Sequence, residues 1–97
     1  MKNKMWELIE DFINKKIDEA YFCENFFILY TDKIDYYEFD EFEQKILSRL
    51  SEVAGRFSAF ETDHKQYPGL YYTKEELLTV IQESKEQLQK RHPEYFQ

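Results

Sequence analysis

Apolar side chains recur every three or four positions over residues 3–15 and again over residues 18–31, which is the spacing of one helix face. Asp18 has the right position and chemistry to cap the second of these predicted helices. The second helix is apolar over more than half of its circumference. Such a helix either lies centrally in the fold or is covered by a partner.

The most regular pattern predicts a long helix over residues 40–60. Its apolar stripe alternates steps of three and four residues and consists of Phe39, Phe42, Ile46, Leu50, Val53, Phe57 and Phe60. Asp40 and Glu43 have the spacing of a capping box at its start. Gly55 is expected in the middle of this helix, where it costs about 1 kcal/mol relative to alanine.

A fourth helix is predicted over residues 73–90. Thr73 and Glu76 form a second capping box at its start, and Pro93 cannot continue it. The preceding segment, residues 61–72, is predicted to be a loop, in which Pro68 and Gly69 fit the two central positions of a type II turn.

Four helices joined by connections of roughly 2, 8 and 12 residues favour antiparallel neighbours. The predicted fold class is therefore all-α, a small antiparallel four-helix bundle, with residues 1–97 forming a single domain. The scarcity of turn residues agrees with this, since the chain contains only two glycines and two prolines.

The net charge of −7 changes the picture of possible partners. A phosphate backbone or an anionic membrane surface attracts the opposite sign, so neither direct nucleic-acid binding nor membrane binding is expected. An acidic chain attracts basic partners, of which nucleic-acid-binding proteins are the commonest.

Most of this charge lies in one window. Residues 32–43 contain six acids and one base, with aromatic residues between them. Acids at the start of a helix can simply complement its dipole. Acids mixed with tyrosines also suit the binding of a basic protein, because acids steer a cationic partner and tyrosines bury area with little loss of entropy. The candidate contact residues of this window are Asp32, Asp35, Tyr36, Tyr37, Glu38, Asp40 and Glu41.

A second acidic and aromatic stretch falls in the predicted loop 61–72. An ordinary exposed loop with two or three aromatics packed on the core would give the same pattern, and we expect Leu70 and one of the tyrosines to pack in this way. A long loop rich in tyrosine is also typical of a contact surface. Its candidate contact residues are Glu61, Asp63, Tyr67 and Tyr71.

The sequence gives little basis for catalysis or for a cofactor. Cys23, the only cysteine, lies on the apolar side of the second predicted helix, and the two histidines, His64 and His92, have no evident catalytic neighbour. The acidic window lacks the spacing and the glycine of a calcium-binding EF-hand loop. We therefore expect no enzyme activity, no metal and no cofactor.

No stretch of the chain approaches the ~20 apolar residues of a membrane span, and the N-terminal residues do not have the pattern of a signal peptide. The expected location is the cytoplasm.

A set of residues spread along most of the chain resembles the pattern of a known family. It comprises residues 12–17 and 26–30, an acidic loop, a helix ending in Ala54-Gly55-Arg56-Phe57, the acids Glu61 and Asp63, and finally Tyr72 and Leu77. Over about residues 8–88 this resembles the colicin D immunity protein family, which includes immunity proteins of contact-dependent growth-inhibition systems.

The resemblance implies a small acidic helical protein of the bacterial cytoplasm that binds the C-terminal nuclease domain of its own toxin and blocks it. In the colicin D case the toxin cleaves tRNA, and acidic groups stand in for tRNA phosphates at its cationic substrate site. Arg56 and Phe57 match the family's Arg-Phe pair, and Glu61 and Asp63 match its acids. Gly55 and Ser58 stand where the colicin D protein has acids, which implies a different cognate toxin.

The alternative is a non-enzymatic helical adaptor or a homodimerisation domain, with the apolar second helix as its interface.

Overall fold

The computed structural model describes residues 2–33 and 38–96. The described residues are mostly helical, and their β-pairing is limited to one isolated bridge between Phe57 and Tyr72, so the all-α prediction is confirmed. The elements in chain order are α1 (Lys2–Ile13), α2 (Glu19–Ile28), the π-helical turn η1 (Leu29–Lys33), α3 (Glu41–Gly55), α4 (Glu61–Gln66), α5 (Lys74–Arg91) and the 3₁₀ turn η3 (Pro93–Phe96).

The predicted local signals at helix starts and at the turn are confirmed. Asp18 caps α2 by accepting a hydrogen bond from the backbone N–H of Tyr21, and both predicted capping boxes, at Asp40 and at Thr73, are formed. The type II turn is present as well. Gly69 has a φ of +81°, and the N–H of Leu70 donates to the carbonyl of Tyr67 over 3.1 Å.

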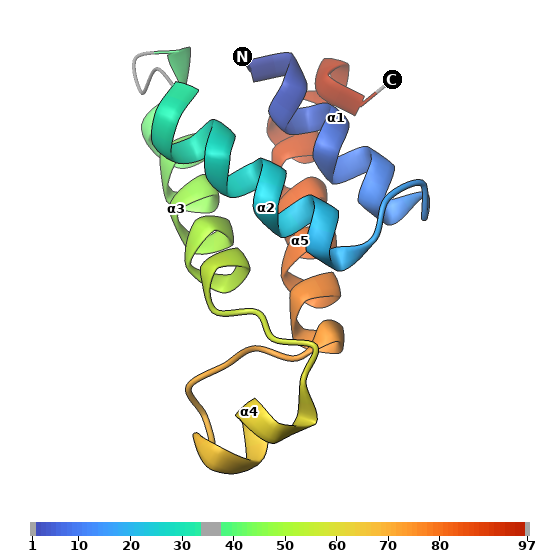
Figure 1. Cartoon of the computed structure of the whole chain (residues 1–97). Helices are drawn as coiled ribbons and strands as arrows, with labels where there is room; N and C mark the ends of the chain where they lie inside the picture. The colour runs from blue at the N-terminus through green and yellow to red at the C-terminus, as the bar shows by residue number, and fades with distance from the viewer. Residues whose placement is uncertain (1, 34–37, 97) are drawn as a thin grey trace.

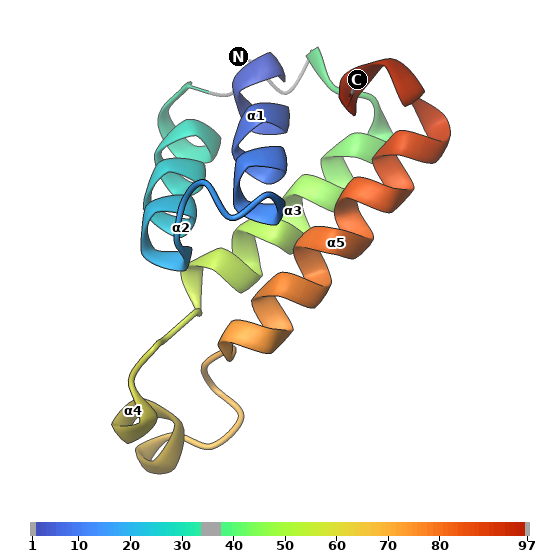
Figure 2. The same cartoon turned by 90° about the vertical axis from the view of Figure 1, so that its right-hand side faces the viewer.

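The core lies between the four longer helices. α1 packs against α2 and α5, and α3 also packs against α2 and α5 (Figure 1). The fully buried side chains come from all four helices: Ile9, Phe22, Phe26, Leu50, Leu77, Ile81 and Leu88. The turn η3 packs against α1 at the end of the molecule where both termini lie (Figure 2).

The long third helix predicted over residues 40–60 is too long, because α3 ends at Gly55. Beyond it the backbone pairs with a distant segment: the N–H of Tyr72 donates to the carbonyl of Arg56 over 2.7 Å, and the N–H of Ser58 donates to the carbonyl of Tyr72 over 3.1 Å. These groups are therefore not available to a helix. Gly55 is exposed at the helix end instead of lying mid-helix.

The segment predicted as a plain loop contains the short helix α4. This helix projects beyond the four longer helices, at the opposite end of the molecule from the start of α3 (Figures 1 and 2). The molecule is 41 Å along its longest axis.

Candidate protein-interaction surfaces

The structure separates the predicted contact residues into two groups at opposite ends of the molecule (Figures 1 and 2). Glu38, Asp40 and Glu41 lie at the start of α3, and the backbone of Asp32 belongs to the nearby turn η1. Asp35, Tyr36 and Tyr37 lie outside the described residues. The second group, on and after α4, comprises Glu61, Asp63, Tyr67 and Tyr71.

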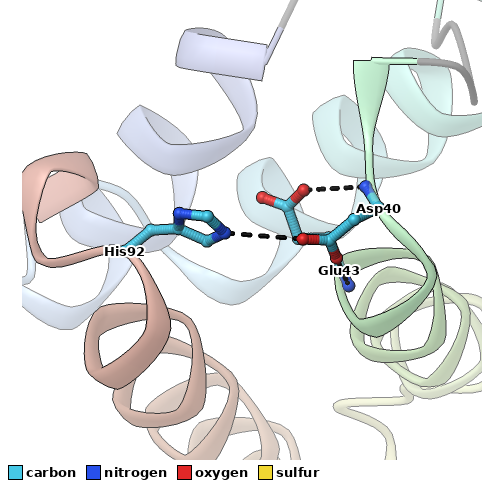
Figure 3. A group of neighbouring side chains, drawn as sticks. All are labelled: Asp40, Glu43 and His92. Atoms are coloured by element: carbon cyan, nitrogen blue, oxygen red, sulfur yellow. Dashed lines mark hydrogen bonds and ion pairs between the residues drawn. The ribbon is translucent and has the colours of Figure 1, made fainter.

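At the start of α3, Asp40 is engaged on both of its carboxylate oxygens. Its Oδ1 accepts from the backbone N–H of Glu43 over 2.8 Å, while Oε1 of Glu43 accepts from the backbone N–H of Asp40 over 2.9 Å. Its Oδ2 faces the end of α5, where Nε2 of His92 lies 3.5 Å away (Figure 3). Nε of Arg91 lies 3.7 Å from the same oxygen. We call these four residues the Asp40 junction.

The electrostatics of the Asp40 junction favour the ionised carboxylate. The pKa of Asp40 is lowered, chiefly by the hydrogen bond from the Glu43 backbone, and further by the contact with His92 and the charge of Arg91; burial opposes this. Asp40 thus links the first turn of α3 to the last turn of α5, where cations complement the helix dipole.

Aromatic residues near the Asp40 junction lie inside the protein. Phe39 is only 4% exposed and meets Trp6 edge-on, with ring centroids 5.8 Å apart. Tyr95 of η3 stacks on Trp6 at 4.9 Å. Phe39 and Tyr95 therefore pack on Trp6 of α1, while Glu38 and Glu41 beside them are exposed.

The same junction brings three metal-ligand types together. One ligand atom each from Asp40, Glu43 and His92 lies within 4.8 Å of the others (Figure 3). Sequence reasoning missed this grouping, because His92 is 52 residues from Asp40 and no local spacing connects them. One oxygen of each carboxylate is already used in the capping box, and Arg91 supplies a positive charge to Asp40. We therefore interpret this group as a contact between α3 and α5 and not as a metal site.

The opposite end presents exposed apolar side chains. We call residues 60–71 the α4 arm. Phe60 is 71% exposed, and Tyr67 and Leu70 are also exposed large hydrophobics. Phe60 and Leu70 were missed as contact candidates. Phe60 continues the stripe of the preceding helix in the sequence, and Leu70 was expected to pack on the core but is exposed. Exposed apolar side chains gathered on one projecting segment mark an interaction surface more strongly than scattered ones do.

Hydrogen bonds at the base of the α4 arm fix its position. The hydroxyl of Ser58 donates to Oδ2 of Asp63 over 2.6 Å and accepts from the N–H of Phe60 over 3.1 Å. Nε2 of His64 lies 2.9 Å from the carbonyl oxygen of Ser58. Asp63 therefore fixes α4 to the preceding segment through Ser58, whereas the Glu61 side chain is 84% exposed and pairs with Lys65.

The two tyrosines of the α4 arm contact each other. The rings of Tyr67 and Tyr71 meet edge-on with centroids 6.3 Å apart, and Tyr71 also meets the ring of His64 at 6.4 Å. Tyr71 is half-buried, so Tyr67 is the more accessible of the two. The large apolar side chains that the arm exposes are thus Phe60, Tyr67 and Leu70, and Glu61 is exposed beside them.

The chemistry of Cys23 is that of a core residue. Burial, with a smaller contribution from the charge of Glu19, raises the pKa of its thiol to about 12. The thiol therefore stays protonated at neutral pH and is a poor nucleophile.

None of the described helices combines the length and apolar character needed to cross a bilayer. Comparisons of the chain with protein-family models, with curated proteins and with solved structures gave no match.

Proposed function

We propose that the protein is an immunity protein that binds the nuclease domain of a cognate bacterial toxin in the cytoplasm and neutralises it. The observation that carries this proposal is the α4 arm, on which Phe60, Tyr67 and Leu70 are held out into solvent. Large exposed side chains on a fixed projection are typical anchors of a protein interface. The proposed target is a tRNA-cleaving ribonuclease, as the resemblance to the colicin D immunity protein family implies.

The charge distribution supports a basic partner. The chain carries a net charge of −7, and Glu38, Glu41 and Glu61 are exposed. A nuclease surface that holds RNA must be cationic, so exposed acids would attract it and speed association. In this proposal the arm supplies the anchors, and the acids at the start of α3 contribute mainly through long-range attraction.

The proposed scaffold is an antiparallel four-helix bundle of α1, α2, α3 and α5. Each of these helices packs against two of the others, which supports the assignment. The bundle would carry the α4 arm at one end, leaving the arm free to enter a concave site on the toxin.

The decisive experiment co-expresses the chain with the toxin nuclease domain encoded immediately upstream. The wild type is expected to co-purify with the domain and to keep cellular tRNA intact. Phe60→Ser with Tyr67→Ser should lose the complex and allow tRNA cleavage. Phe27→Ser is the matched control, because Phe27 is an exposed phenylalanine on α2, away from the arm.

Three outcomes would contradict parts of this proposal. Cleaved tRNA with the wild-type chain present would overturn the immunity function. A complex that survives the arm substitutions but is lost in the Phe27→Ser variant would move the contact to α2. A complex equally stable at low and at high salt would remove the role of the acids in attraction.

A further inference from the structure

The outward face of α2 carries a second group of exposed apolar residues that the proposed function does not use. Tyr21, Phe27 and Ile28 are 52%, 48% and 41% exposed. The same helix already contributes Phe22 and Phe26, both fully buried, to the core. Sequence analysis expects this helix to be central or covered, and in the structure it crosses one face of the molecule between α1 and α3 (Figure 1).

Two open hollows flank this face. The first, of about 400 Å³, lies between α1 and α2 and is lined by Leu8, Tyr21 and Ile28 among others. The second, of about 560 Å³, lies between α2 and the end of α3, and Phe27, Ile28 and Gly55 line it. A Cβ atom added at Gly55 would meet no atom within 4 Å, so this hollow is open there. The α2 face is therefore a ridge with a groove on each side.

The charged residues that line the hollows indicate what could cover this ridge. They comprise three acids, Glu7, Asp11 and Glu24, and one base, Lys4. Lys15 and Lys16, in the turn before α2, line neither hollow. With a net charge of −7 on the whole chain, a second copy would bring acids against acids. The complementary occupant combines an apolar strip with basic flanks.

Because the ridge is a helix, it favours a helical partner over an extended peptide. A helix has no free backbone edge to which an extended peptide could add, so affinity here must come from side-chain packing. A ridge between two grooves is the surface against which another helix packs. We propose that the α2 face, made of Tyr21, Phe27 and Ile28, docks a cationic amphipathic helix of a partner protein. This surface is separate from the α4 arm and does not depend on the proposed function.

The test uses a fluorescein-labelled 16-residue helical peptide of leucines and lysines, with the leucines on one face, and measures fluorescence anisotropy with the full chain. A peptide of the same pattern with glutamates in place of the lysines is the matched ligand control. We expect roughly micromolar binding of the lysine peptide at 150 mM salt, and binding at least about tenfold weaker for the glutamate peptide.

Variants locate the binding surface. Phe27→Ser with Ile28→Ser removes apolar area from exposed positions, so the fold should persist, as circular dichroism would verify; binding should weaken by about tenfold or more. Glu24→Lys should weaken it by a smaller factor. Phe60→Ser, on the arm, should leave peptide binding unchanged, although it is expected to impair toxin capture.

Several results would overturn the proposal. They are an absence of binding, equal binding of the two peptides, or binding that the Phe27→Ser and Ile28→Ser changes leave intact. Sedimentation velocity provides a further test. A dimer at micromolar concentration that these two changes dissociate would show that a second copy covers the face.

Discussion

At the end of the molecule where α3 begins, Phe39 is 4% exposed and packs on Trp6, while Asp40 binds the end of α5. At the opposite end, Phe60 is 71% exposed, and Asp63 accepts a hydrogen bond from the nearby Ser58. Both stretches mix acids with aromatics in the sequence. The difference is that the first stretch contacts α1 and α5, which are distant in the sequence, whereas the hydrogen bond of the second, between Asp63 and Ser58, is local. Composition alone therefore does not distinguish a structural junction from a contact surface.

The largest expected difference between the two ends is in the response to losing a phenylalanine. Phe39→Ala should lower the free energy of unfolding by about 3–5 kcal/mol, because it removes a buried ring and leaves a cavity. Phe60→Ala should change it by less than about 0.5 kcal/mol, since the ring is exposed. Urea denaturation of both variants measures the contrast. Equal losses would mean that the arm packs against the four longer helices in solution.

The carboxylate of Asp40 should matter more than that of an ordinary helix cap. Asp40→Ala is expected to cost about 0.5–2 kcal/mol, towards the upper part of the range for a lost N-cap, because the contacts with Arg91 and His92 are lost as well. Asp18→Ala is the matched control: Asp18 caps α2 through one hydrogen bond of 2.8 Å. Urea denaturation of the two variants gives the comparison, and an equal cost would show that α5 adds nothing measurable to the cap.

A smaller effect is expected at the two glycines. Gly69→Ala places a side chain at a φ of +81° and should cost about 1 kcal/mol in the α4 arm. Gly55→Ala should be close to neutral, because the new methyl group meets nothing within 4 Å. Hydrogen exchange of the arm amides, followed by NMR, would show the local cost. Unchanged exchange rates in the Gly69→Ala variant would argue against the type II turn.

Sequence reasoning succeeded where the determining contacts are local. The caps at Asp18, Asp40 and Thr73 and the turn at Pro68–Gly69 each depend on residues no more than three positions apart, and all are present in the structure. The all-α class follows from the same local signals.

Sequence reasoning failed where residues far apart in the sequence form the backbone hydrogen bonds that a helix would otherwise make. The apolar stripe continues through Phe57 and Phe60, but pairing of the backbone with Tyr72 ends the helix at Gly55. The structural role of Asp40 could not be predicted either. Arg91 and His92 are about 50 residues away in the sequence, and the tertiary fold brings them next to Asp40. The exposure of Phe60 is a consequence of the same pairing, since the chain leaves the four longer helices there (Figure 1).

The smallest expected effect is the pH dependence that the Asp40 junction confers. The pKa of Asp40 is lowered in the folded protein, so the unfolded chain binds the proton more readily. The stabilisation is therefore fully present above the ordinary pKa of about 3.9 and is lost as the pH falls through the lower, folded value. We expect the free energy of unfolding of the wild type to fall more steeply below about pH 4 than that of Asp40→Asn. Parallel profiles for wild type and Asp40→Asn would mean that the carboxylate at the α3–α5 junction is no better stabilised than one in solvent, and the contrast between the two ends would then depend on the aromatic residues alone.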